Sequence, residues 1–171
     1  MADLRWFIRG EMKAVVQRVL NANVSVNNIL KGSIDCGLLV YLGVAHNDSE
    51  ADAEKLAEKI AFLRIFNDKD GKMNLSLKDL IENNKNINPQ SVTGVLAISQ
   101  FTLLADTRKG RRPSWHEAAA LEKANQLYQY FMEAVKKQGI ICEKGEFQAH
   151  MKVSYTNDGP VTIILDTEEL K

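Results

Sequence analysis

Hydrophobic and polar residues alternate along much of the chain, and this pattern predicts a fold rich in β-strands. From residue 13 to residue 26 the alternation predicts a strand, a break near Asn21 and a second strand, and the Asn27–Asn28 pair that follows is typical of a hairpin turn. Residues 37–44, GLLVYLGV, are apolar almost without interruption, as expected of a strand buried on both faces. The same reasoning predicts further strands at residues 29–34, 92–104, 150–157 and 161–166.

Two stretches have helical periodicity instead. The Asp48–Ser49 pair can cap a helix whose apolar positions recur every three or four residues from Ala53 to Leu63. Ser114 and Glu117 form a capping-box pattern, which predicts that a second, long helix begins there and ends at Gly139. The apolar stripe of this second helix would consist of Leu121, Ala124, Tyr128, Phe131 and Val135.

Polar segments connect these elements without dividing the chain. Residues 66–74, FNDKDGKMN, predict a turn in which Gly71 takes a positive φ angle, and the Asn-rich residues 78–90 predict a surface loop. No internal repeat, low-complexity tract or linker is found after Met12. We therefore expect one α/β domain of the α+β-like kind, rich in strands and with two main helices, over residues 12–171, preceded by an extension of unknown role at residues 1–11.

The composition narrows the classes of function. The chain has 171 residues, of which 45% are hydrophobic and 26% charged, which is typical of a globular protein. Basic and acidic residues number 22 each, so no overall field attracts a polyanion, and any contact with nucleic acid requires a local patch. Residues 1–11 carry charges throughout and hold no apolar run of signal-peptide length, so we expect neither secretion nor a membrane segment.

The residues that most often bind metals are scattered. Cys36 and Cys142 form no CxxC pair, which fits a reducing compartment such as the cytoplasm, and we expect both to be small core residues. His46, His116 and His150 form no HExxH motif and no cluster with carboxylates at ligand spacing. We predict no metal and no cofactor.

The segment SQFTL, residues 99–103, lies at the end of the strongest predicted strand. Strand ends are common places for active sites because side chains open into a crevice there. Alternation puts Ser99 and Phe101 on one face and Gln100 and Thr102 on the other, so simple polarity at a sheet edge also explains the segment. A hydroxyl nucleophile would need a neighbouring base, and neither a GxSxG nor an SxxK motif supplies one.

A short segment after SQFTL concentrates positive charge. We call TRKGRRP, residues 107–113, the basic loop; its glycine lets backbone N–H groups turn toward an anion, which suits contact with phosphate better than the recognition of bases. An ordinary solvated loop remains the alternative. The four cations are Arg108, Lys109, Arg111 and Arg112.

Gly159 and Pro160 adjoin at the junction of the last two predicted strands. Glycine lets another backbone or a ligand approach closely, and X-Pro bonds in folded proteins are cis in about one case in twenty. A cis bond would point two neighbouring carbonyl oxygens in nearly the same direction, as a steric wall without side chains. On residue type alone, a trans strand break or bulge is the more frequent explanation.

Taken together, these stretches resemble the D-aminoacyl-tRNA deacylase family, whose members hydrolyse D-amino acids from mischarged tRNA. The resemblance extends from Met12 over the rest of the chain and rests on two signature motifs, SQFTL and NDGPVT, in this order and at this separation. The Asn-rich residues 78–90 and the extension at residues 1–11 depart from the family pattern, and neither touches a motif. Supporting stretches are KAVVQRV, GLLVYLGV, RIFNDKDGKMN, ADTRKGRRPS and YFMEAV.

This resemblance implies a β/β/α layered fold and a two-fold homodimer with each active site at the dimer interface. Gly159 and Pro160 would form a cis peptide, supported by Arg18 and Asn157, that enters the partner's pocket as a chirality filter. The substrate partner would be the 3′ end of aminoacyl-tRNA, with the cations of the basic loop on its phosphates. The pocket for the 3′-aminoacyl-adenosine would be lined by Ser99, Gln100, Phe101 and Thr102, with Met151 in its wall.

The resemblance also bears on mechanism. The family is described as using the terminal 2′-hydroxyl of the tRNA to assist water, and because the sequence shows no base beside Thr102, we favour this route over a covalent Thr102 nucleophile. Carbonyl groups that exclude any L-side chain would still admit glycine, so activity on glycyl-tRNA is expected as well.

Two other classes of function stay open at this point. One is a non-enzymatic nucleic-acid-binding protein that uses the basic loop, and the other is a hydrolase of small esters that does not require tRNA. Zero net charge and one short basic loop predict weak, salt-sensitive binding, which suits the grip on a single acceptor end better than dedicated DNA binding.

Overall fold

The structure is a computed structural model that describes residues 11–84 and 91–170. Most of the expected extension at residues 1–11 and the second half of the Asn-rich segment lie outside the described residues.

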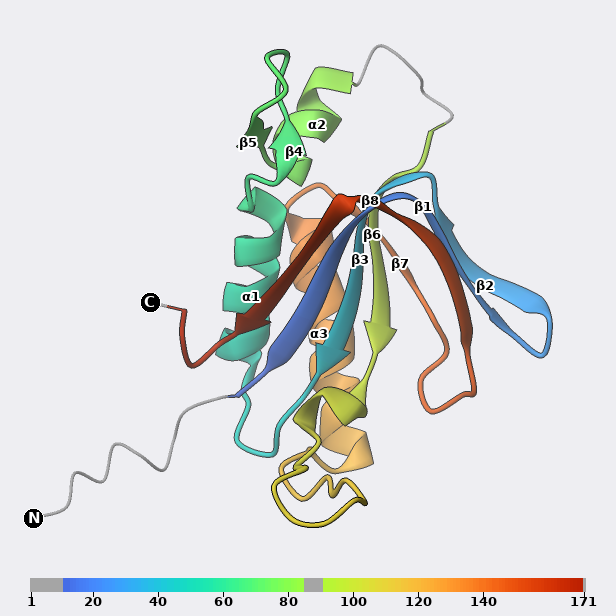
Figure 1. The fold of residues 1–171 in the computed structure, drawn as a ribbon, viewed down its shortest axis with the longest axis vertical. Helices are drawn as coiled ribbons and strands as arrows, with labels where there is room; N and C mark the ends of the chain where they lie inside the picture. Colours follow the sequence, from blue (N-terminus) through green and yellow to red (C-terminus); the bar gives the residue numbers. More distant parts are fainter. Residues whose placement is uncertain (1–10, 85–90, 171) are drawn as a thin grey trace, which may run out of the picture.

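One curved, mixed sheet dominates the fold (Figure 1). Within the described residues it holds six strands in the order β2-β1-β3-β6-β7, with β8 paired to the other edge of β1. The pairs β3–β6 and β6–β7 are parallel, whereas β1 is antiparallel to β2, β3 and β8. The strands are β1 (Lys13–Val26), β2 (Ile29–Ile34), β3 (Cys36–Gly43), β6 (Thr93–Ser99), β7 (Ile141–Lys144) and β8 (Lys152–Asp166).

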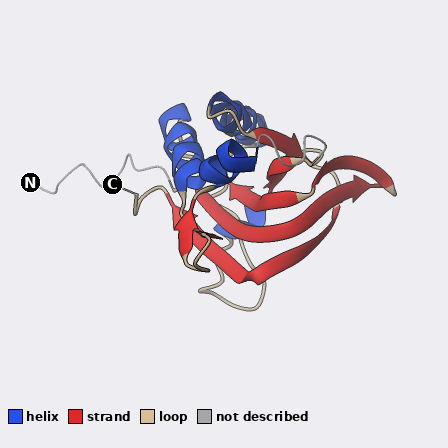
Figure 2. Ribbon diagram, turned by 90° about the horizontal axis from the view of Figure 1, so that it is seen from above, coloured by secondary structure: helices blue, strands red, loops and turns tan. Residues whose placement is uncertain are grey.

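The helices lie together on one side of this sheet, as Figure 2 shows. Helices α1 (Glu50–Phe62) and α3 (Leu121–Lys137) contribute their apolar faces to the main core. A hairpin of β4 (Phe66–Asn67) and β5 (Met73–Leu75) leads into the short helix α2 (Leu77–Asn84). The described part of the chain thus forms a single mixed α/β domain with three α-helices.

Strand β3 is buried on both faces, as its unbroken apolar run predicts. Leu38 and Leu42 point into the main core beneath the helices. Leu39 belongs to a second buried cluster on the opposite face, together with Leu96 and Ile98 of β6. Two apolar layers, one on each side of the central strands, explain why these strands lack a polar face.

The second layer exists because the sheet curls over itself at β2. Gly32 of β2 comes so near β7 that a Cβ atom there would lie 2.5 Å from the carbonyl oxygen of Lys144. The next residue back, Lys31, forms an ion pair with Glu146 at 2.7 Å between Nζ and Oε2. The central strands, the part of the sheet that curls over them at β2 and the helices therefore form the β/β/α layers that the resemblance implies.

Several local predictions are confirmed. Asn27 and Asn28 both have positive φ angles, 50° and 63°, as a tight hairpin turn requires. Ser49 caps α1 through a capping box with Asp52. Gly71 and Gly139 each adopt a φ angle of 76°, in the β4–β5 turn and just after α3.

Other predictions are wrong at their boundaries. Helix α3 begins at Leu121 and not at Ser114, because the Ser114 backbone pairs with Asp106 in both directions, at 3.0 and 2.8 Å. Part of the Asn-rich segment belongs to helix α2. The hydroxyl and the backbone N–H of Ser76 both donate to the Asp79 carboxylate, at 2.7 and 2.8 Å, and these hydrogen bonds cap the start of the helix. These caps give the domain a third helix where we expected two.

The strand boundaries also differ from those predicted. Strand β1 runs through Asn21 without a break, because β8 pairs along its whole length and absorbs the irregularity as shifts in register. The two predicted C-terminal strands are likewise one strand, β8, which continues through Gly159. Cys36 and Cys142 form no disulfide and are partly buried; Cys142 packs against the main core as predicted, whereas Cys36 belongs to neither buried cluster.

Candidate active site

The SQFTL segment marks the point where β6 leaves the sheet. Strand β6 ends at Ser99, and residues Phe101–Leu104 turn into the short 3₁₀-helix η2. The Gln100 N–H donates to the Leu42 carbonyl at 2.7 Å, which ties the start of the turn to the end of β3. The prediction that this strand continues to residue 104 is therefore wrong, and the early end frees the side chains from strict alternation.

A largely apolar cavity of about 570 Å³ opens at this strand end. We call it the apolar cavity. Ser99, Gln100, Phe101 and Met151 are among the residues that line it. The remaining walls come from the start of α3, the segment before it and residues 147–153, including Trp115, Ala119, Leu121, Phe147 and His150.

Thr102 lies on η2, outside the residues that line the apolar cavity. Its hydroxyl accepts a hydrogen bond from the Gln100 amide at 2.6 Å. Among the described residues, no histidine or carboxylate is hydrogen-bonded to the hydroxyl of either Ser99 or Thr102. The geometry therefore lacks the base that a hydroxyl nucleophile needs.

Two aromatic side chains mark one edge of the apolar cavity. The rings of Phe101 and Trp115 meet edge to face, with centroids 5.6 Å apart and an interplanar angle of 67°. Both side chains stay accessible, with 55% of Phe101 and 40% of Trp115 exposed. Such exposure is unusual for large aromatic residues and leaves ring faces available to a ligand.

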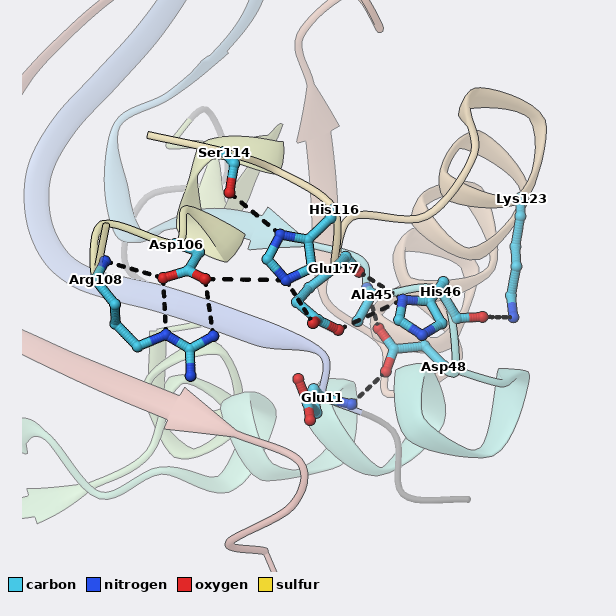
Figure 3. A network of polar contacts seen from close by, with 10 residues as sticks. All are labelled: Glu11, Ala45, His46, Asp48, Asp106, Arg108, Ser114, His116, Glu117 and Lys123. Atoms are coloured by element: carbon cyan, nitrogen blue, oxygen red, sulfur yellow. Dashed lines mark hydrogen bonds and ion pairs between the residues drawn. The ribbon is translucent and has the colours of Figure 1, made fainter. Parts of the chain in front are cut away.

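Next to this edge, the basic loop is anchored by a network of polar contacts (Figure 3). The Arg108 guanidinium donates two parallel hydrogen bonds to the Asp106 carboxylate, both 2.8 Å. These bonds hold the pKa of Asp106 well below its usual range. His116 connects Asp106, 3.9 Å away, to Glu117 at 2.9 Å. His46 contacts Glu117 in turn, so the network joins the basic loop to the segment after β3.

A second cavity of about 560 Å³ lies within the basic loop, and we call it the basic cavity. Because the Arg108 guanidinium is engaged by Asp106, its charge is largely balanced. Lys109, Arg111 and Arg112 form no ion pair with any described carboxylate. The basic cavity is lined by Asp106, Arg108, Lys109, Arg112, Ser114 and His116.

Gly159 and Pro160 form the other part of the expected site. Their peptide bond is cis, and both residues are exposed on β8. Gly159 has a φ angle of 121°, and a Cβ there would lie 2.9 Å from Val161 Cγ2 and 3.0 Å from Arg18 Nη2. Only glycine fits this backbone position.

Arg18 and Asn157 contact the backbone next to the Gly159–Pro160 pair. The Arg18 side chain is 8% exposed, and its Nε contacts the Asp158 carboxylate at 3.0 Å and the Asp158 carbonyl at 3.3 Å. The Asn157 amide donates to the carbonyls of Arg18 and Val161 at 2.9 and 3.0 Å. The backbone on both sides of the Gly-Pro pair is thereby fixed.

The two parts of the expected site do not meet within one chain. Arg18 pairs with Leu38 near the start of β3, whereas Ser99 pairs with Leu42 at its end. Four residues of strand separate these levels by about 13 Å. Accordingly, neither Gly159 nor Pro160 lines the apolar cavity.

Sequence reasoning missed part of the site. Trp115, Phe147 and the small residues before α3 line the apolar cavity. The signal in the sequence that could have pointed to Trp115 is the position of a tryptophan two residues after the basic loop. Among the described residues, no group of three or more metal-ligating side chains is found. No helix in the described part of the chain is long and apolar enough to cross a membrane.

Comparison with known proteins identifies similar sequences over nearly the whole chain. The family model described as D-Tyr-tRNA(Tyr) deacylase matches residues 15–166. The D-aminoacyl-tRNA deacylase of Thermosipho melanesiensis is 52% identical over 160 residues, which cover 93% of this chain and 99% of that protein. The D-aminoacyl-tRNA deacylase of Thermus aquaticus is 49% identical over 158 residues, covering 92% and 97%.

Two solved structures have a similar fold. A c-Myc DNA unwinding element binding protein has a TM-score of 0.76 and 37% identity, with 90% of this chain and 97% of that chain covered. A probable eukaryotic D-amino acid tRNA deacylase has a TM-score of 0.74, with 91% and 98% covered. At 16% identity, the second similarity concerns the fold alone.

Proposed function

The chain belongs to the D-Tyr-tRNA(Tyr) deacylase family, and we propose that it is an enzyme that hydrolyses the ester bond of D-aminoacyl-tRNA to release free tRNA and the D-amino acid. The observation that carries this proposal is the apolar cavity at the end of β6, lined by Ser99–Phe101 of the SQFTL motif. A cavity of about 570 Å³ is of the size that holds small molecules and nucleosides. The reaction is a proofreading step that removes mischarged amino acids.

We further propose that Gly159 and Pro160 complete the apolar cavity of a second copy of the chain. The pair is exposed, its backbone is fixed by Arg18, and it lies far from the cavity of its own protomer. In a two-fold dimer, the contact between the Gly159–Pro160 pair of one copy and the apolar cavity of the other occurs twice, which produces two complete sites. This arrangement uses both motifs in each site.

The surface around the pair supports such a dimer. On β8, Val161 and Ile163 pack against the main core, so Pro160, Thr162 and Ile164 project from the opposite face. Ile164 is 73% exposed, a large value for an apolar side chain in the body of a sheet. Further exposed apolar side chains of the sheet are Leu20, Ile29, Leu30 and Tyr155.

Carbonyl oxygens suit the discrimination of enantiomers. The D- and L-forms of an amino acid bury the same groups, so apolar contact alone cannot distinguish them, and one side chain must be refused its space. A backbone wall excludes an L-side chain of any size because it has no flexible side chain that can move aside. Glycine has no side chain to exclude, and we therefore propose activity on glycyl-tRNA too.

For the chemical step we propose that the terminal 2′-hydroxyl of the tRNA assists the attack of water on the ester. No described residue places a base beside Thr102, and its hydroxyl accepts a hydrogen bond from Gln100, so a covalent route through Thr102 is poorly supported. The cavity contributes orientation of the substrate, and the backbone N–H groups of Phe101 and Thr102 are candidates for stabilising the oxyanion.

We propose that Lys109, Arg111 and Arg112 contact tRNA phosphates, with Arg108 holding the loop through Asp106. The balanced net charge argues against DNA as a partner. Because its substrate belongs to translation, we place the enzyme in the cytoplasm.

One assay tests the proposed function against its alternatives. Purified protein is incubated with D-tyrosyl-tRNA, L-tyrosyl-tRNA and a simple D-tyrosine ester, and the release of tyrosine is followed. Release from D-tyrosyl-tRNA alone supports the proposal. Equal release from the simple ester identifies a small-ester hydrolase, and binding of tRNA or duplex DNA without any release identifies a binding protein.

A further inference from the structure

Trp115 lies in a chain segment whose residues line both the apolar cavity and the basic cavity. Its indole lines the apolar cavity, whereas its two neighbours in the chain, Ser114 and His116, line the basic cavity. The shortest stretch of chain shared by the two cavities is therefore centred on this residue, and a ligand that reaches from one cavity to the other along this segment contacts it. Because 40% of Trp115 is exposed, the indole is available for contact along that path.

The indole is held in place before any ligand arrives. The backbone of Ser114 is paired with Asp106, and the Trp115 carbonyl accepts a hydrogen bond from the Ala118 N–H at 3.1 Å. The ring itself packs edge to face on Phe101. A pre-ordered aromatic group loses little conformational entropy when a planar ligand stacks on it.

The charges beside Trp115 favour an anionic ligand on the side of the basic cavity only. Lys109 and Arg112 line the basic cavity without an ion-pair partner among the described carboxylates. Of the nearby acidic groups, Asp106 is bound by Arg108 and Glu117 is bound by His116. An exposed aromatic ring next to unpaired cations is the combination that proteins use to bind single-stranded nucleic acid.

We propose that Trp115 is a stacking platform for the base that precedes the terminal adenosine of the RNA substrate. The terminal nucleoside and its ester occupy the apolar cavity, the strand passes over the indole, and the adjoining phosphate enters the basic cavity. This inference rests on the proposed function. It adds a residue that binds a base found only in substrates whose RNA strand extends beyond the terminal adenosine. The stack contributes to affinity for tRNA and not to the chemistry of the ester.

Kinetics on two substrates of different length test this role. Trp115→Leu removes the ring and Trp115→Phe retains one, while Phe62→Leu alters an exposed aromatic residue of α1 outside both cavities. For D-tyrosyl-tRNA we expect the Leu variant to raise KM about tenfold, or about 1.4 kcal/mol, with little change in kcat. For the D-tyrosyl ester of adenosine, which lacks the preceding base, KM should stay within about twofold of the wild-type value, and Trp115→Phe should recover most of the affinity for tRNA.

An equal loss on both substrates would show that Trp115 only shapes the apolar cavity, and an unchanged KM for tRNA would overturn the stack as well. A binding measurement keeps the inference separate from hydrolysis. In a Trp6→Phe background Trp115 is the sole tryptophan, and its fluorescence is followed during titration with the trinucleotide CCA. Quenching by CCA, but not by the same trinucleotide with an abasic middle position, supports stacking even if no ester is cleaved. Equal quenching by the two refutes it.

Discussion

Arg18 is the residue whose replacement best tests how the Gly159–Pro160 segment is held. We consider Arg18→Met, which retains an unbranched apolar stem and removes the guanidinium. In the folded protein, Nη1 donates to the Ile65 carbonyl at 2.7 Å, while Nε contacts Asp158. The substitution therefore removes the donor of one buried acceptor and the ion-pair partner of one carboxylate.

These two losses differ in size. The Ile65 carbonyl is left without its buried donor, which costs about 1–3 kcal/mol. The Asp158 side chain is 40% exposed and can be hydrated by water, so the loss of its ion pair with Arg18 adds less than about 1 kcal/mol. We expect the free energy of unfolding to fall by about 1–4 kcal/mol, which for 171 residues corresponds to about 2–16 °C in Tm.

Thermal and urea unfolding at fixed protein concentration measure this change. Arg64→Met is the matched control, because Arg64 also bonds a backbone carbonyl, that of Asn74 at 2.7 Å, but is exposed. We expect the control to lose less than about 0.5 kcal/mol. Equal stability of the two variants would refute the reasoning that burial of the Arg18 bonds matters.

The milder Arg18→Lys variant connects this support to selectivity. Lysine keeps the charge, but it has no planar fork and cannot serve Ile65 and Asp158 in the same geometry. We expect the ratio of kcat/KM for D- over L-tyrosyl-tRNA to fall at least tenfold at a temperature where the variant remains folded. An unchanged ratio would contradict the claim that Arg18 positions the filter.

Three further outcomes follow from other parts of the molecule. Burial raises the pKa of Asp48 to about 6, so its contribution to stability is complete below pH 3.8 and is lost as the pH rises through about 6. Between pH 4 and pH 7 the Tm of Asp48→Asn should therefore fall less than the Tm of the wild type or of a Glu50→Gln control. NMR titration of the Asp48 carboxyl group checks the pKa directly. Gly37→Ala should cost at least about 3 kcal/mol in urea unfolding, because its Cβ would lie 2.0 Å from the Gly94 carbonyl, whereas Gly71→Ala, with open space around it, should cost only about 1 kcal/mol. Thr102→Ala should retain kcat within about tenfold on D-tyrosyl-tRNA, and an acyl adduct on Thr102 detected by mass spectrometry would contradict the substrate-assisted route.

The periodic parts of the fold could be predicted from the sequence because local pattern and final burial agree there. The apolar run of β3 and the Ser49 cap of α1 are examples, since one reflects burial on two faces and the other is a local hydrogen-bonding motif. Ser114 had the same local pattern as Ser49, yet the structure uses its backbone to pair with Asp106. A capping motif is therefore overridden where a competing tertiary hydrogen bond is available.

The candidate site divides in the same way. The sequence pattern places Ser99 near the end of a strand, and the structure has the apolar cavity at the end of that strand. Trp115 and Phe147 could not be assigned to that cavity, because the segments that carry them have no regular periodicity. Their positions depend on contacts such as the bridge between Ala45 and Ala118, which join residues distant in the chain.

The role proposed for Gly159 depends on the stiffness of its surroundings. A filter made of carbonyl oxygens has no side chain to adjust, so its accuracy is that of the backbone itself. Arg18 contacts Asp158 on one side, and the Asn157 amide binds the carbonyl of Val161 on the other. Because Arg18 also donates to Ile65, the segment is tied to the connection between α1 and the β4–β5 hairpin, which lies outside the lining of the apolar cavity of the same chain. In the proposed dimer, each copy therefore holds its Gly-Pro pair through contacts with its own core, and the exposed face of the pair is free to enter the cavity of the partner.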